Sequence, residues 1–135
     1  MPALGRQLSN GWALALCYYV GFRGHDLSVA VAVMSAESAR WTENFHINYP
    51  GSTQESTDRG LFQINDMWHP DLSDEDAYKA IPNARYAYKM SSGQYFGAWA
   101  AYKSGRYLYY MPFVWACRVR GRWKLKIHRV RQELG

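Results

Sequence analysis

The chain has 135 residues, of which 48% are apolar and 20% are charged. This length suits one domain with one core, and the composition excludes an intrinsically disordered protein. The formal net charge of +5 is unevenly placed, because residues 1–117 carry nine basic and ten acidic side chains, whereas residues 118–135 carry seven basic side chains and only Glu133. We therefore expect a domain over 1–117, followed by a basic tail over 118–135 that packs on the domain or extends from it.

The first predicted helix follows Ser9 and Asn10, either of which can act as its N-cap, and it ends at Gly21. Its apolar stretch, residues 12–20, is similar to the core of a signal peptide, but no small-residue cleavage site follows it. We therefore predict a helix of the protein core and no cleaved leader. No apolar run reaches the roughly 18 residues that a membrane span requires, so we expect no transmembrane segment.

A second helix is predicted to begin after Asp26, as its N-cap, and to reach Glu37. The residues between them are apolar on nearly every face, which is typical of a helix buried in the middle of a domain. A carboxyl group at the end of such a helix either finds a partner or has its pKa raised by loss of hydration. Glu37 is therefore a candidate catalytic acid, the alternative being an exposed acid at a helix end.

Residues 41–56 are polar and rich in turn formers, which predicts a loop or a short hairpin. A turn at Arg59 and Gly60 is expected to lead into a short strand. Period-two alternation along that strand places the side chains of Gln63 and Asn65 on one side. The sequence thus predicts a pair of amides that can line a cleft.

The remaining chain is predicted to be helical, with a short helix capped by Ser73 and further helices over 83–90 and 96–103. The four histidines have no ligand spacing, and Cys17 and Cys117 fit no metal-binding pattern. We therefore expect neither a metal nor a cofactor. The two cysteines are expected to be buried free thiols, the alternative being a disulfide in an oxidising compartment.

Five segments, taken together, are specific enough to be compared with a known family. They are residues 20–27, 36–38, 56–65, 83–85 and 99–102. Two of them, Ala-Glu-Ser at 36–38 and Ser-Thr-Asp-Arg-Gly-Leu-Phe-Gln-Ile-Asn at 56–65, resemble the active-site core of the lysozyme-like superfamily. Residues 20–27 are similar to phage and actinobacterial muralytic domains in particular. The resemblance covers roughly residues 8–110 of the chain.

The resemblance implies an α+β fold that is mainly helical, with a small β-hairpin wing and a sugar-binding cleft between wing and helices. It implies that Glu37 is the general acid that protonates the glycosidic oxygen. Asp58 matches the second carboxylate in the Ser-Thr-Asp-x-Gly sequence of animal-type lysozymes. It follows Glu37 by 21 residues, a longer spacing than that group shows, and the extra length falls in the loop. The alternative is that Asp58 only supports a turn.

The implied reaction is cleavage of the β-1,4 bond between N-acetylmuramic acid and N-acetylglucosamine in bacterial peptidoglycan. Many relatives with a Glu-Ser and a Gly-Leu-x-Gln pattern are lytic transglycosylases, which use a single glutamate and leave a 1,6-anhydro product. The presence of Asp58 favours hydrolysis. A glycan-binding module without catalysis is a further alternative, and it predicts that a Glu37→Gln variant behaves as the wild type.

The side chains predicted to bind the glycan share either a hydrogen-bonding group or a flat aromatic face. They are Ser38, Gln63, Asn65, Trp68, Trp99 and Tyr102. The amides of Gln63 and Asn65 suit N-acetyl and hydroxyl groups, the alternative being hydrogen bonds to backbone within the wing. Ser38 either positions the acid or ends the helix.

The basic tail suits an anionic wall polymer or a virion protein as partner, and we do not expect nucleic acid binding because the basic residues occupy only the tail. Alternation over residues 122–127 predicts either a strand or an amphipathic piece that faces a membrane. By analogy with the family, we expect a phage lysin or virion-associated enzyme that acts on the bacterial cell wall without a cleaved signal peptide.

Overall fold

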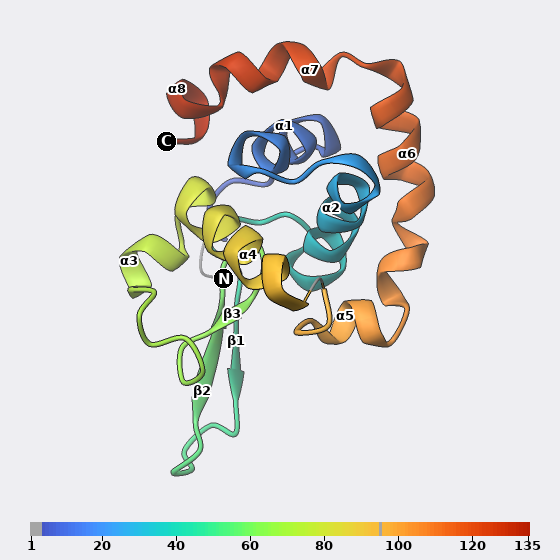
Figure 1. Ribbon diagram of the computed structural model, residues 1–135. Helices are drawn as coiled ribbons and strands as arrows, with labels where there is room; N and C mark the ends of the chain where they lie inside the picture. Colours follow the sequence, from blue (N-terminus) through green and yellow to red (C-terminus); the bar gives the residue numbers. More distant parts are fainter. Residues whose placement is uncertain (1–3, 95) are drawn as a thin grey trace.

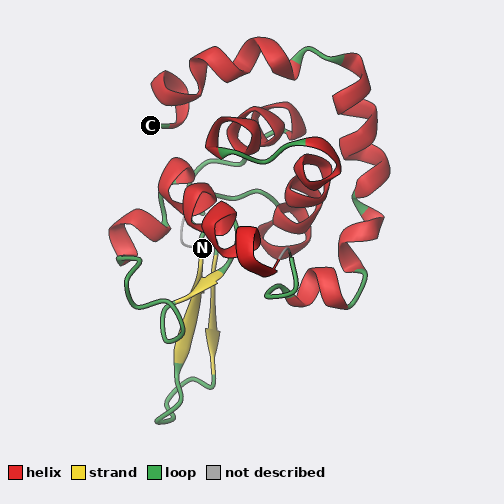
Figure 2. Cartoon of the chain, viewed as in Figure 1, coloured by secondary structure: helices red, strands yellow, loops and turns green. Residues whose placement is uncertain are grey.

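The computed structural model describes residues 4–94 and 96–135. A helical body carries a small antiparallel sheet that projects from one side (Figures 1 and 2). The helices are α1 (Asn10–Val20), α2 (Gly24–Ser38), α3 (Asp74–Ala77), α4 (Ala80–Gln94), α5 (Ala100–Lys103), α6 (Met111–Arg120), α7 (Trp123–Lys126) and α8 (Val130–Leu134), with 3-10 turns η1 (Arg106–Tyr109) and η2 (Ile127–Arg129). The strands β1 (Phe45–Asn48), β2 (Ser56–Arg59) and β3 (Ile64–Asn65) pair in that order. The mainly helical α+β prediction is confirmed.

Helix α1 has the predicted cap and the predicted burial. The Ser9 hydroxyl accepts a hydrogen bond from the backbone N–H of Trp12 at 3.2 Å, and residues 13–17 are buried. The helix ends at Gly21, whose φ of 132° is one that glycine adopts readily. The apolar stretch is therefore a core helix, as the sequence indicated.

Helix α2 begins earlier than predicted. Its N-cap is Arg23, which makes no side-chain capping bond, and Asp26 lies within the first turn. The expectation that Asp26 caps this helix is wrong, although a negative side chain in the first turn is still favourable to the helix dipole. Residues 27–35 are buried without a break, because α1, α6 and η1 all pack against this helix.

The segment directly after β2 is a turn, and the short strand that the sequence predicted is limited to β3, Ile64–Asn65. The Gln63 N–H donates to the Gly60 carbonyl at 3.1 Å, and Gln63 has a left-handed φ of 49°. The expected alternation is therefore wrong, since the neighbours Leu61 and Phe62 are both buried. Gly60 is required here: its φ is +75°, and an added Cβ would lie 2.2 Å from the Ala77 carbonyl oxygen.

The later helices differ from prediction at their ends. Helix α4 begins at Ala80 and tolerates Pro82 because the first turn of a helix needs no N–H from that residue. The helix predicted over 96–103 is helical only from Ala100, since the preceding residues form turns. Of the two alternatives for residues 122–127, the strand is wrong: this segment forms α7 and enters η2.

The C-terminal segment lies against the helical body. The buried Trp123 ring packs on Tyr18 of α1 at 5.8 Å between centroids, and Val130 and Leu134 are buried in the same core. Cys17 and Cys117 are both free thiols. Cys17 is buried and Cys117 half-buried, and burial raises the pKa of both.

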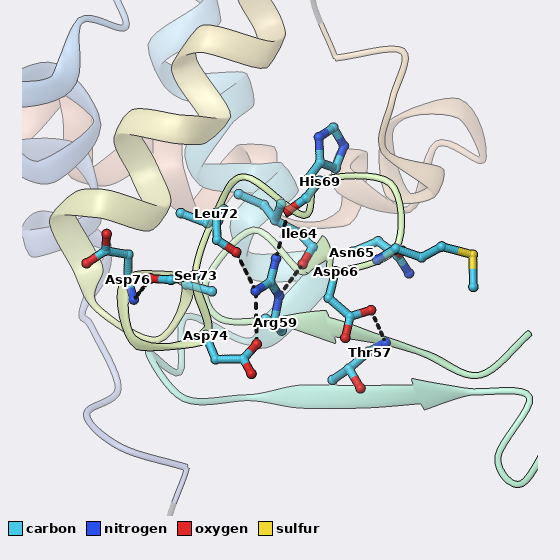
Figure 3. Close-up of polar contacts among 12 residues, drawn as sticks. Thr57, Arg59, Ile64, Asn65, Asp66, His69, Leu72, Ser73, Asp74 and Asp76 are labelled. Carbon is cyan, nitrogen blue, oxygen red and sulfur yellow. Dashed lines mark hydrogen bonds and ion pairs between the residues drawn. The ribbon is translucent and has the colours of Figure 1, made fainter.

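Arg59 is the largest fully buried polar side chain of the described residues, and it holds the loop that follows β2 (Figure 3). Its guanidinium donates to the carbonyls of Ile64 (3.1 Å) and Leu72 (2.8 Å), and to Asp74 Oδ1 at 3.0 Å. A longer bond reaches the His69 carbonyl at 3.4 Å. One cation thus satisfies backbone groups over residues 64–72, a stretch whose only regular element is the two-residue strand β3.

We predict that Arg59→Met lowers the free energy of unfolding by about 3 kcal/mol, because it leaves buried carbonyls without donors. Asp74→Asn should cost less than about 1 kcal/mol, because the Asp74 side chain is 80% exposed and its ion pair is screened by water. Urea unfolding of both variants measures the difference. Equal losses would mean that the ion pair, and not the set of backbone contacts, fixes the loop.

Candidate active site

Glu37 stands on the last turn of α2, where the buried helix meets the sheet side of the molecule. Its side chain is 11% exposed. Its carboxylate lies 3.9 Å from the Arg106 guanidinium, a contact at the outer limit of an ion pair. The acid is therefore neither in open solvent nor locked into a close ion pair.

The electrostatics around Glu37 favour a protonated acid. Burial raises its pKa above the ordinary value and is the largest influence, and the negative charge of Asp58 raises it further. The Arg106 cation and the Ala101 N–H act in the opposite direction. The net shift is upward, as expected for a carboxyl group at the end of an apolar helix.

Asp58 lies in the middle of the sheet and is held by two amides. Asn65 Nδ2 donates to Oδ1 at 2.9 Å, and Asn48 Nδ2 donates to Oδ2 at 3.1 Å. Asn65 sits directly across from Asp58 in the β2–β3 register, which is why its side chain reaches the carboxylate. Each carboxylate oxygen of Asp58 therefore has a fixed amide donor, and the orientation of the group is set.

Glu37 and Asp58 line the same cleft, which has a volume of about 360 Å³. This lies within the range of about 300–1,000 Å³ that is typical of small-molecule sites. Glu37 comes from the helical body and Asp58 from the sheet, so the two carboxyl groups belong to different walls. The other lining residues are Gln63, Ile64, Asn65, Trp68, His69, Met90, Ala98, Trp99 and Ala100.

The predicted pair of amides, Gln63 and Asn65, lines the cleft. Most of its hydrogen bonds are made to other groups of the protein. Asn65 donates to Asp58 and to Ser56, and its oxygen accepts from two backbone N–H groups. Gln63 donates through Nε2 to the carbonyls of Asn44 and Gly60, which leaves its oxygen as the end that can meet a ligand. The arrangement favours a positioning role for Asn65 and a binding role for the Gln63 carbonyl.

The remaining predicted residues are placed differently from one another. Trp68 is 77% exposed at the rim of the cleft, whereas Trp99 is buried in its wall and donates through Nε1 to the Phe62 carbonyl at 2.8 Å. Ser38 is buried and bonds to the Met34 carbonyl and the Arg40 N–H, which corresponds to the helix-ending alternative. Tyr102 is not among the residues that line the cleft and stacks on Tyr107.

Sequence reasoning missed three polar side chains of this site, Arg106, His69 and Asn48. Arg106 reaches Glu37 from η1, far along the chain, and no local pattern signals that approach. His69 lines the cleft and makes a 3.1 Å bond with the Tyr86 hydroxyl. Because Tyr86 gives its own proton to Asp71 at 2.6 Å, His69 must donate through Nδ1, which leaves Nε2 as an acceptor in the neutral ring.

A second hollow, of about 430 Å³, lies between the start of α2 and the end of α4. Among the described residues, Asp26 is the only acidic one that lines this hollow, so the hollow lacks the carboxyl pair of the cleft. Over residues 4–94 and 96–135, no group of three or more His, Cys, Asp or Glu side chains could hold a metal ion. In the same part of the chain, no helix is both long enough and apolar enough to cross a membrane.

Comparison with known proteins agrees with the geometry of the site. No curated protein matches the chain. A family model described as a lysozyme-like domain matches residues 14–101, a span that includes Glu37, Asp58 and every lining residue of the cleft. Such domains are typically glycosidases or lytic transglycosylases, and the match indicates a role connected with peptidoglycan. The chain belongs to the lysozyme-like domain family.

Proposed function

We propose that this protein is a muramidase, which hydrolyses the β-1,4 bond between N-acetylmuramic acid and N-acetylglucosamine in bacterial peptidoglycan. The observation that carries the proposal is the pairing of two unlike carboxyl groups in one cleft. Burial raises the pKa of Glu37, while Asp58 is held by two amide donors in the facing sheet. Two carboxyl groups in different environments are the pattern expected of a glycosidase acid and its partner.

In the first step, Glu37 donates its proton to the oxygen between the two sugars, so that the leaving sugar departs as a neutral alcohol. Positive charge then develops at the anomeric carbon of the other sugar. The Asp58 carboxylate stabilises this charge, either by attack on the carbon or as an ion pair. Glu37, now a carboxylate, accepts a proton from the water that completes hydrolysis, and both groups return to their starting state.

The cleft supplies groups that suit an N-acetylated glycan. The Gln63 carbonyl can accept a hydrogen bond from an N-acetyl N–H, and the exposed Trp68 ring offers an apolar face for a sugar ring. The proposed place of action is the bacterial cell wall, and a phage lysin or virion-associated enzyme is the biological setting that fits the family. The rival reaction, lytic transglycosylation, needs only Glu37, so the role of Asp58 decides between them.

Glu37→Gln keeps the size of the side chain and removes its acid proton. We expect the rate of muropeptide release from purified peptidoglycan to fall about 10³-fold, the range of general acid catalysis being about 10²–10⁴. Mass analysis of the released muropeptides measures the loss. Unchanged release would show that the cleft binds glycan without cutting it.

The same variant should gain stability at neutral pH. The pKa of Glu37 is raised in the folded state, so stability falls as the pH rises from the unfolded pKa through the folded one. Glu37→Gln removes this loss, and urea unfolding should show an advantage over the wild type at pH 8 that shrinks at pH 4. A variant that is less stable at both pH values would argue that the carboxylate holds the fold together.

Asp58→Asn tests hydrolysis against transglycosylation. We expect the rate to fall by about 10²-fold or more, because the neutral amide cannot stabilise the developing cation. Wild-type products should carry reducing ends, whereas a transglycosylase gives products that are one water lighter. Near-normal rates in Asp58→Asn, or anhydro products from the wild type, would contradict the two-carboxylate mechanism.

Arg106→Gln should move the alkaline limb of the pH–rate profile to higher pH. Arg106 lowers the pKa of Glu37, so its removal raises that pKa and keeps the acid protonated over a wider range. The exposed Lys103 provides the control, because it is not among the charges that shift Glu37, and Lys103→Gln should leave the limb in place. A limb that moves to lower pH in Arg106→Gln would assign it to another group.

A further inference from the structure

The outward side of α6 is apolar, and in the described part of the chain Tyr109 packs on one edge of it, with its ring centroid 5.9 Å from that of Phe113. Phe113, Trp115 and Val119 are exposed, Trp115 by 58% and Val119 by 69%. At 3.6 residues per turn these three, together with Arg120, fall within about half of the circumference of the helix. We call these four residues the outer face of α6. A soluble surface rarely gathers large apolar side chains in this way without a partner.

The inward side of α6 packs against the helical body. Val114 is buried, and Arg118 donates to the Gly24 carbonyl and to the Ser28 hydroxyl of α2. Trp123, just beyond the helix, donates to the Arg118 carbonyl at 3.2 Å. Figure 1 shows α6, α7 and α8 as an arc along the outer edge of the helical body. These contacts fix α6 against the body, so its exposed apolar side chains point outward.

The stretch of sequence that contains this face carries charge of one sign. No acidic residue occurs between Asp76 and Glu133, and Arg120, Arg122 and Lys124 follow one another at the end of α6 and in α7. All three are exposed, and the exposed Leu125 comes next. The outer face and the segment that follows it thus combine two aromatic rings, the aliphatic side chains of Val119 and Leu125, and three cations.

We propose that the outer face of α6, with Arg122 and Lys124, binds the surface of an anionic lipid bilayer. Trp115 and Val119 enter the headgroup region, where tryptophan is favoured, and the cations contact lipid phosphates. A second copy of the chain fits less well, since it would bring two clusters of like charge together. A water-soluble anionic polymer would pair with the arginines but leave the apolar side chains in water.

The test is co-sedimentation of the full chain with vesicles of phosphatidylglycerol and phosphatidylcholine, compared with phosphatidylcholine alone. We expect binding only to the anionic vesicles. The pair Trp115→Gln and Val119→Gln should weaken the partition coefficient about tenfold. Neutralising Arg120, Arg122 and Lys124 with Gln should weaken it by about two orders of magnitude, on the basis of about fivefold for each charge near the surface.

Matched controls come from elsewhere on the surface. Tyr49→Asn removes an exposed aromatic from the hairpin at a residue whose φ of 51° suits asparagine, and it should bind as the wild type. Neutralising the exposed Lys79, Arg85 and Lys89 of the α3–α4 region with Gln should have a much smaller effect than the α6–α7 set. Thermal unfolding confirms that each variant is folded.

Three results would overturn the proposal. They are equal binding to neutral vesicles, undiminished binding by the Trp115 and Val119 variant, and a dimer in sedimentation analysis that this variant abolishes. The proposal is independent of the muramidase activity, because no residue of α6 to α8 lines the catalytic cleft. Glu37→Gln should bind vesicles normally, and the Trp115 and Val119 variant should digest soluble glycan fragments within about twofold of the wild-type rate.

Discussion

The candidate site depends on one buried cation, Arg59, and on the chain that it organises. The loop from Gly60 to Asp74 carries most of the sheet-side wall of the cleft, yet it has little regular structure. Arg59 provides donors to carbonyls along this loop. Asn83 adds a second fixed point, since it bonds to the Arg59 carbonyl and to the Phe62 N–H. A loop held in this way can present Asn65 and Trp68 at constant positions.

The two walls of the cleft place their carboxyl groups in different electrostatic environments. On the helical side, burial at the end of α2 removes water from Glu37 and raises its pKa. The Arg106 cation limits this rise. On the sheet side, Asp58 keeps its orientation through Asn48 and Asn65. An acid that transfers its proton and then recovers it needs a pKa near the working pH. The long Arg106 contact moderates the shift without forming a tight pair.

The sequence allowed the helical core and the place of Glu37 at the end of an apolar helix to be predicted because their causes are local. A cap at Ser9, an apolar run and a lone carboxyl group can each be read within one turn or two. The strand expected after Gly60 forms only at Ile64–Asn65, because the left-handed conformation at Gln63 depends on a tertiary contact. Arg106, His69 and the network of Arg59 were not foreseen for the same reason, since each acts on residues distant in sequence or on backbone groups.

The C-terminal segment stabilises the fold, and its anchoring also bears on the proposed binding to a bilayer. The side chains of Trp123, Val130 and Leu134 are buried against the body. These contacts fix the position of the segment that bears the basic residues between them. A free cationic tail would lose much conformational entropy on reaching a bilayer. A segment already ordered by its apolar anchors avoids most of that cost. The alternation over residues 122–127 is therefore explained without a strand. Trp123 is buried, and the charged side chains on either side of it remain in water.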